Sequence, residues 1–236
     1  MNTQKPYTKS NLYAKILVLF LLFFIGLIIS TEIKDTFNKK WVNTFYISIG
    51  AFWGFFIVYG SRLLKVFSFP KIYIRMIYAL MAIALILALT IVNPIFDFHS
   101  DRTFAPVFFF YHVFTLCMTI MISIGILKDI FSSESTKVDH IWGAIVVYFF
   151  GVLAFGEIYE MITIVEPGLL GKVYTMGIQN FAECILFSAN AVSGLDSLYP
   201  DADPLLKKLA NIENIAGNLF LIVILGRLLS HPLKSR

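Results

Sequence analysis

The feature that most constrains the fold is a series of long apolar runs. Six of them cover residues 12–31, 41–60, 72–93, 105–131, 140–163 and 209–230. An α-helix rises about 1.5 Å per residue, so each run is near the roughly 20 residues that cross about 30 Å of hydrocarbon. Only 14% of the 236 residues are charged and 58% are hydrophobic, which is too apolar for a soluble globular chain. The sequence therefore predicts an all-α membrane protein with six transmembrane helices.

The charges in the loops predict the orientation of these helices. Basic residues gather in the N-terminal arm, at the C-terminal end and in the second loop, which holds Arg62, Lys65, Lys71 and Arg75. The 94–104 loop instead carries Asp97, Asp101 and only Arg102, whereas the first loop, with Lys34, Lys39 and Lys40, is an exception. Basic loops stay on the cytoplasmic side. With six crossings, we expect both termini in the cytoplasm.

A weaker apolar stretch, residues 174–192, lies between the fifth and sixth runs. It is interrupted by four polar residues, Gln179, Asn180, Glu183 and Asn190. A complete crossing here would place the C-terminus outside, so we expect this stretch to be re-entrant, entering and leaving on the outer face. Non-helical backbone at membrane depth is tolerated only where protein or a water-filled cavity shelters it. The stretch therefore predicts a pore or a transport site.

The segment from 136 to 230 carries a recognisable order of features. The re-entrant stretch leads into Val192, Ser193, Gly194, Leu195, Asp196 and Ser197. Tyr199 and Pro200 follow, and Glu213 and Gly217 lie on the last run. This order resembles the pore module of tetrameric cation channels, and most closely the small bacterial potassium-channel-like proteins.

The resemblance implies an outer helix, a pore helix, a filter loop and an inner helix, repeated in a homotetramer. It implies that residues 192–197 form the selectivity filter and that Glu183 supports the filter from behind. It also implies that Glu213 bonds the filter loop and that Gly217 is a hinge of the inner helix. The protein would then reside in the bacterial cytoplasmic membrane and conduct a monovalent cation, with no resident cofactor.

The filter residues depart from the TVGYGD pattern of potassium channels. Carbonyl-lined potassium sites need two glycines, and here only Gly194 remains, with Leu195 and Asp196 at the tyrosine and second glycine positions. Four copies of Asp196 would form an acidic ring that concentrates cations. The tripeptide Leu195-Asp196-Ser197 is also similar to the filter core of bacterial sodium channels. We therefore expect sodium-type or weakly selective conduction rather than strict potassium selectivity.

Two alternatives stay open from the sequence. Asp196 can also be an ordinary turn residue, because Gly-x-Asp-Ser is common turn chemistry. The altered filter also fits a channel-derived, non-conducting membrane sensor or scaffold that works with a separate cytoplasmic effector or regulator. A cation channel requires a conducting pore, whereas a non-conducting sensor or scaffold predicts a blocked pore axis.

Further carboxylates lie near the predicted outer end. Glu157 and Glu160 are three residues apart, so they share one helical face. They predict either charges of an outer vestibule or a hydrogen-bonded brace to the pore helix, and we favour the brace. Asp201 and Asp203 either add to a negative outer funnel or are solvated loop charges.

The rest of the sequence excludes several classes of function. We expect residues 1–135 to form a four-helix membrane region and residues 136–236 the pore-like module. The run at 105–131 has no basic residue before Lys128, so it is not a voltage sensor. His112 and Cys117 lie about 140° apart around a helix, so we expect no shared metal ion. No catalytic motif and no basic patch for nucleic acid is present, and the chain is not predicted to be an enzyme.

Overall fold

The computed structural model describes residues 9–33, 70–91, 102–131, 137–174, 176–194 and 199–230. These residues form α-helices and one short 3-10 helix, with no strand among them. The elements are α1 (Lys9–Ile33), α3 (Lys71–Ile91), η2 (Arg102–Phe104), α4 (Ala105–Ile130), α5 (Lys137–Val165), α6 (Ile178–Ser193) and α7 (Pro204–Ser230). The all-helical class predicted from the sequence is therefore confirmed for the described part of the chain.

Three of these helices are long and apolar enough to cross a membrane. They cover Arg102–Ile130, Val138–Val165 and Pro204–Arg227. Helices α1 and α3 also coincide with predicted apolar runs, and the predicted run at 41–60 lies outside the described residues. The chain is thus a helical membrane protein by composition and helix length, and the count of six crossings stays a prediction.

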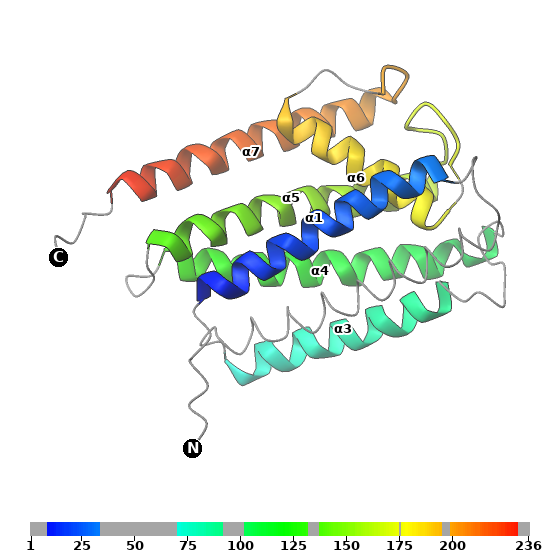
Figure 1. Cartoon of the computed structure of the whole chain (residues 1–236). Coiled ribbons are helices and arrows are strands. Elements are labelled where there is room, and N and C mark those ends of the chain that lie inside the picture. The colour runs from blue at the N-terminus through cyan, green and yellow to red at the C-terminus, as the bar shows by residue number, and fades with distance from the viewer. Residues whose placement is uncertain are drawn as a thin grey trace.

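The helices lie side by side around α5. Figure 1 shows α1, α3 and α5 running in one direction, while α4 and α7 run in the opposite direction. α5 contacts α1, α4, α6 and α7. One hydrophobic core joins α1, α3, α4, α5 and α6, and it includes Ile77, Ile126, Val146 and Ile185, none of which has any exposed surface. A common hydrophobic core therefore contains residues from both sides of the predicted boundary at residue 135.

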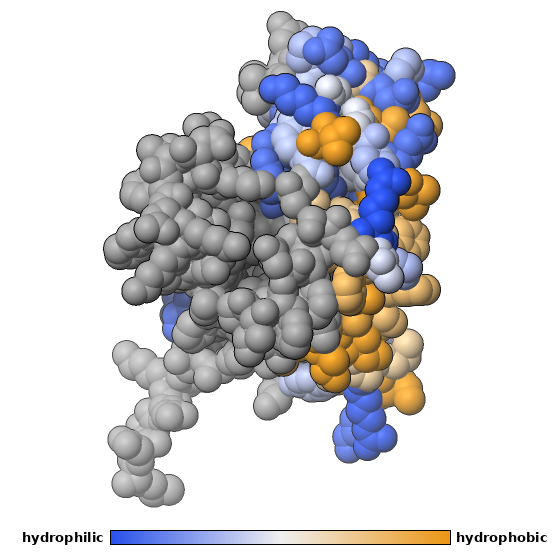
Figure 2. Space-filling model, turned by 90° about the vertical axis from the view of Figure 1, so that its right-hand side faces the viewer, coloured by the Kyte–Doolittle hydropathy of each residue, from blue (hydrophilic) through white to orange (hydrophobic). Residues whose placement is uncertain are grey.

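α5, α6 and α7 meet at one end of the bundle. α5 ends there, α6 begins there, and α7 begins at the same end after the 199–203 turn (Figure 1). Figure 2 views the molecule from this end, and hydrophilic residues gather at the height where Figure 1 places the start of α7. Pro204 suits the first turn of α7 because proline fits the start of a helix.

α5 and α6 approach each other closely at a glycine. A Cβ atom added to Gly156 would overlap Cδ1 of Ile185 and lie 3.2 Å from the Cα of Ile185. Ile185 is completely buried, so it has no free volume into which it can move. The separation between α5 and α6 therefore depends on the missing side chain of Gly156.

We expect the change Gly156→Ala to destabilise the protein by about 1–3 kcal/mol, because it overpacks the contact between α5 and α6. Gly151→Ala is the matched control, since a Cβ atom at Gly151 meets nothing within 4 Å. Thermal unfolding in detergent measures the melting temperatures of the two purified variants. Equal melting temperatures for the two variants would contradict the proposed close contact.

Candidate functional site

α6 lies obliquely between α5 and α7 and ends partway along α7. It has 16 residues, which is shorter than a complete crossing requires. At its start, Asn180 Nδ2 donates hydrogen bonds to Glu160 Oε2 at 2.9 Å and to Thr163 Oγ1 at 2.7 Å, near the end of α5. At its other end, Val192 Cγ2 lies 2.5 Å from the position of a Cβ atom on Gly217, in the middle of α7. The end of α6 is therefore beside the middle of α7.

Glu213 joins three helices at the middle of α6. Tyr159 of α5 donates a hydrogen bond to Glu213 Oε2 at 2.8 Å, and Ser188 of α6 donates one to Glu213 Oε1 at 2.5 Å. Ser188 Oγ also lies 2.8 Å from the carbonyl oxygen of Val152. All of these side chains are buried. These bonds run to α5 and α6, and the bond from Glu213 to the filter loop that the resemblance implies stays a prediction, because residues 195–198 lie outside the described residues.

Glu183 is tied to the chain that follows the predicted filter. Tyr199 donates a hydrogen bond to Glu183 Oε2 at 2.6 Å, and its ring packs edge-on against Phe187 at 5.3 Å. Burial, and then the neighbouring Glu183 carboxylate, raise the pKa of the Tyr199 phenol above its usual range. Tyr199 therefore stays a hydrogen-bond donor in alkaline solution, and it fixes the returning chain against α6.

The predicted filter is described as far as its third residue. Val192 and Ser193 are the last residues of α6, and Ser193 Oγ donates to the carbonyl oxygen of Asn190 at 2.9 Å. Gly194 caps the helix with φ of 66°, a left-handed conformation that favours glycine. Its absent Cβ would lie 3.5 Å from Asn214 Nδ2. Leu195, Asp196 and Ser197 lie outside the described residues.

The two aspartates after Pro200 lie at the polar end of the molecule. Asp203 Oδ1 accepts a hydrogen bond from the backbone N–H of Leu205 at 2.7 Å, so it stabilises the start of α7. The backbone N–H of Asp203 donates to the carbonyl oxygen of Leu169 at 2.7 Å. Asp201 is exposed and packs beside Gly171, whose φ is 88°. This end is therefore bound to the segment between α5 and α6.

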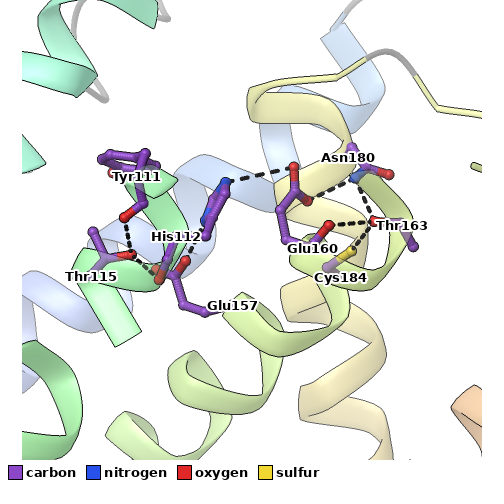
Figure 3. Close-up of polar contacts among 8 residues, drawn as sticks. All are labelled: Tyr111, His112, Thr115, Glu157, Glu160, Thr163, Asn180 and Cys184. Atoms are coloured by element: carbon purple, nitrogen blue, oxygen red, sulfur yellow. Dashed lines mark hydrogen bonds and ion pairs between the residues drawn. The ribbon is translucent and has the colours of Figure 1, made fainter. Parts of the chain in front are cut away.

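A second polar cluster joins α4, α5 and α6. Figure 3 shows His112 of α4 between Glu157 and Glu160 of α5. His112 Nδ1 makes a close contact with Glu157 Oε2, and Nε2 lies 3.7 Å from Glu160 Oε1. Both carboxylates have no exposed surface, so within the subunit they brace α5 against α4 and α6 and do not face water.

The sequence contained a signal for this cluster, but it did not identify the partners. The spacing of His112 and Cys117 argues against a shared metal ion, but it says nothing about partners on other helices. The carboxylate partners of His112 lie 45 residues or more further along the chain, and spacing within one helix does not reveal them. The usable signal was the presence of ionisable residues inside apolar runs, which normally pair with one another. Among the described residues, no group of three or more His, Cys, Asp or Glu side chains is arranged to hold a metal ion.

Comparisons with known proteins identify no relative: no protein-family model, no curated protein and no solved structure matches this chain. The assignment of the candidate site therefore rests on the geometry of the described residues and on the motifs in the sequence.

We expect Glu213→Leu to destabilise the protein by about 1–3 kcal/mol, because it leaves the buried Tyr159 hydroxyl without its acceptor. The double variant Tyr159→Phe/Glu213→Leu should recover part of that loss, since it also removes the unpaired donor. Chemical or thermal unfolding of the four proteins in a double-mutant cycle measures the coupling. Strict additivity of the two changes would show that this hydrogen bond contributes no stability.

Proposed function

We propose that the chain is the pore-forming subunit of a homotetrameric cation channel with sodium-type or weak selectivity. Residues 136–236 of each subunit would surround one central pore, with α6 as a re-entrant pore helix. The helices of residues 1–135 would surround this pore module. The membrane would be the bacterial cytoplasmic membrane, with both termini in the cytoplasm.

The observation that carries this proposal is the position of the C-terminal end of α6. The end of a helix carries a partial negative charge from its unpaired carbonyl groups, and this charge favours cations nearby. α6 places that end beside Asn214 and Gly217, which are in the middle of a helix long enough to span the bilayer. A helix end at that depth supports a cation site inside the membrane.

The surface of α7 supports a water-filled axis and an assembly of subunits. Asn211, Asn214 and Asn218 share one face of α7, because they are spaced by three and four residues. Asn218 Nδ2 donates to Asn214 Oδ1 at 2.6 Å. Polar amides are unfavourable against lipid. A fourfold arrangement would place these amides on the axis.

Much of α7 also lacks a partner within the subunit. Only 17% of its most apolar window is buried, against 50% for the corresponding window of α5. Exposed apolar side chains of α7 include Ile212, Ile215, Leu219, Ile222 and Leu225. Neighbouring subunits and lipid would cover them in a tetramer.

The ends of the helices agree with the orientation expected from the loop charges. α1, α3 and α5 begin with Lys9, Lys71 and Lys137 at the same end of the bundle, and α4 ends there with Lys128 in its last turn (Figure 1). The positive-inside rule assigns this end to the cytoplasm. The predicted filter then opens toward the outer side.

We expect Asp196→Asn to reduce cation flux several-fold or to change the sodium-to-potassium preference, because it removes the charge of the proposed acidic ring. Flux into proteoliposomes under opposed sodium and potassium gradients measures both quantities. Glu166→Gln is the matched control, since Glu166 is an exposed carboxylate at the end of α5 and should leave flux unchanged. Unaltered flux in Asp196→Asn would remove the filter assignment. An absence of flux in the wild-type tetramer would favour the non-conducting sensor or scaffold.

We expect Asn214→Leu to lower conductance, because it replaces the amide beside the end of α6 with an apolar side chain. The control is Ile215→Leu, one residue further along α7, where the side chain is already exposed and apolar. Single-channel recording in planar bilayers compares the two variants. Similar conductances would show that the amide face of α7 does not line the ion path.

A further inference from the structure

The cluster of His112, Glu157 and Glu160 contains more acidic groups than its basic group can neutralise. All three side chains are buried, with 2%, 0% and 0% of their surface exposed. In the described part of the chain, His112 is the basic side chain that the two carboxylates contact. With His112 positive and both carboxylates ionised, the cluster carries one net negative charge inside the helix bundle.

Among the described residues, the neighbouring groups offer hydrogen bonds and rings but no compensating charge. α4 contributes Tyr111, whose ring lies 4.9 Å from that of His112. α6 contributes Asn180 and the thiol of Cys184, which is 3.6 Å from Thr163 Oγ1. The ring of Phe181, also on α6, lies 5.3 Å from His112.

The other two helices that pack on α5 do not supply a cation to the cluster either. α1 reaches this region through Phe23, which packs against Phe181. α7 places Glu213 on the opposite side of α5, where Tyr159 and Ser188 bond it. Within the described part of the chain, the charge balance of the cluster therefore depends on its own three ionisable groups, with Tyr111 and Cys184 as neighbours.

The two carboxylates also differ in their contacts. Glu157 makes the close contact with His112 Nδ1, so these two side chains form the ion pair. Glu160 Oε2 accepts a hydrogen bond from Asn180, and Glu160 Oε1 lies at the longer distance of 3.7 Å from His112 Nε2. Among the described residues, Oε1 of each carboxylate is buried without a hydrogen-bond partner. Two buried carboxylates share one imidazolium, and His112 holds Glu160 less closely than Glu157, so a proton is more stable on Glu160.

We propose that His112, Glu157 and Glu160 form a proton-binding site at the junction of α4, α5 and α6, with Glu160 as the group that takes up the proton. One carboxylate and one proton combine to give a neutral carboxylic acid, and the charge of the cluster changes from −1 to zero. Because Asn180 in the first turn of α6 bonds Glu160, loss of the proton changes the anchor of α6. The site thereby couples protonation to the position of the proposed pore helix.

Infrared spectroscopy of the full chain in lipid nanodiscs tests the site without any measurement of transport. We expect the carboxylic-acid C=O band at neutral pH to lose one component in Glu160→Gln, a change that preserves the shape of the neutral side chain. Glu166→Gln is the matched control, because Glu166 is exposed just after the end of α5 and lies outside the cluster. An acid band that is identical in wild type and Glu160→Gln would overturn the proposal.

Two further variants test the charge balance and keep the proposal testable if Glu160→Gln fails to fold. Glu157→Gln removes the negative partner of His112, so Glu160 should then ionise and the acid band should weaken. His112→Asn removes the positive charge, so both carboxylates should bind protons and the acid band should strengthen. A change of the acid band in the same direction in both variants would contradict a shared proton site. A purely structural role of the cluster does not predict opposite changes of the band.

The effect on transport depends on the proposed function, whereas the infrared result does not. Cation flux of the wild type should vary with pH, and flux of Glu160→Gln should lose that dependence. If the acid band behaves as described but no flux is found, the proton site stands and the channel proposal fails. If flux is found but Glu160→Gln retains every component of the acid band, the channel stands and the proton site fails.

Discussion

The structure depends on one constraint: a polar side chain inside an apolar helix bundle needs a partner on another helix. α6 meets this constraint at three levels along its length. Asn180 bonds α5 at its start, Ser188 bonds Glu213 at its middle, and Glu183 bonds Tyr199 of the returning chain. Removing one partner leaves the other group buried and unsatisfied, which costs more than the bond itself contributes. These polar contacts therefore fix the position and the tilt of a helix that is too short to be fixed by crossing the membrane.

α5 connects the two polar clusters because its faces carry different partners. Glu157 and Glu160 point toward α4 and α6, whereas Tyr159 reaches α7 through Glu213. Adjacent residues in a helix are turned by about 100°, so one turn of α5 serves neighbours on several sides. The contact of α4 with Glu157 therefore lies within one helical turn of Tyr159, whose hydrogen bond to Glu213 holds α7.

The sequence allowed the helical class and the presence of carboxylates inside apolar helices to be predicted, because each follows from local composition or from spacing within one helix. It did not allow the partners to be predicted. His112 and Glu157 are 45 residues apart, and Tyr159 and Glu213 are 54 residues apart. Such pairs depend on the rotation of each helix about its own axis, and the uniformly apolar α5 gives no periodicity from which that rotation could be read. For Glu213, the structure shows Ser188 and Tyr159 as partners, and the last three residues of the predicted filter lie outside the described residues.

The close packing at Gly156 has a consequence for how the protein can move. With Ile185 in contact with the backbone of α5, these two helices can neither slide nor rotate past each other without a clash, so they behave as one rigid body. α7 has few contacts by comparison, and the side chains from Leu221 to Val223 are exposed on it. Among the described helices, α7 is therefore the one that packing fixes least, and a bend of α7 would leave the α5–α6 contact unchanged.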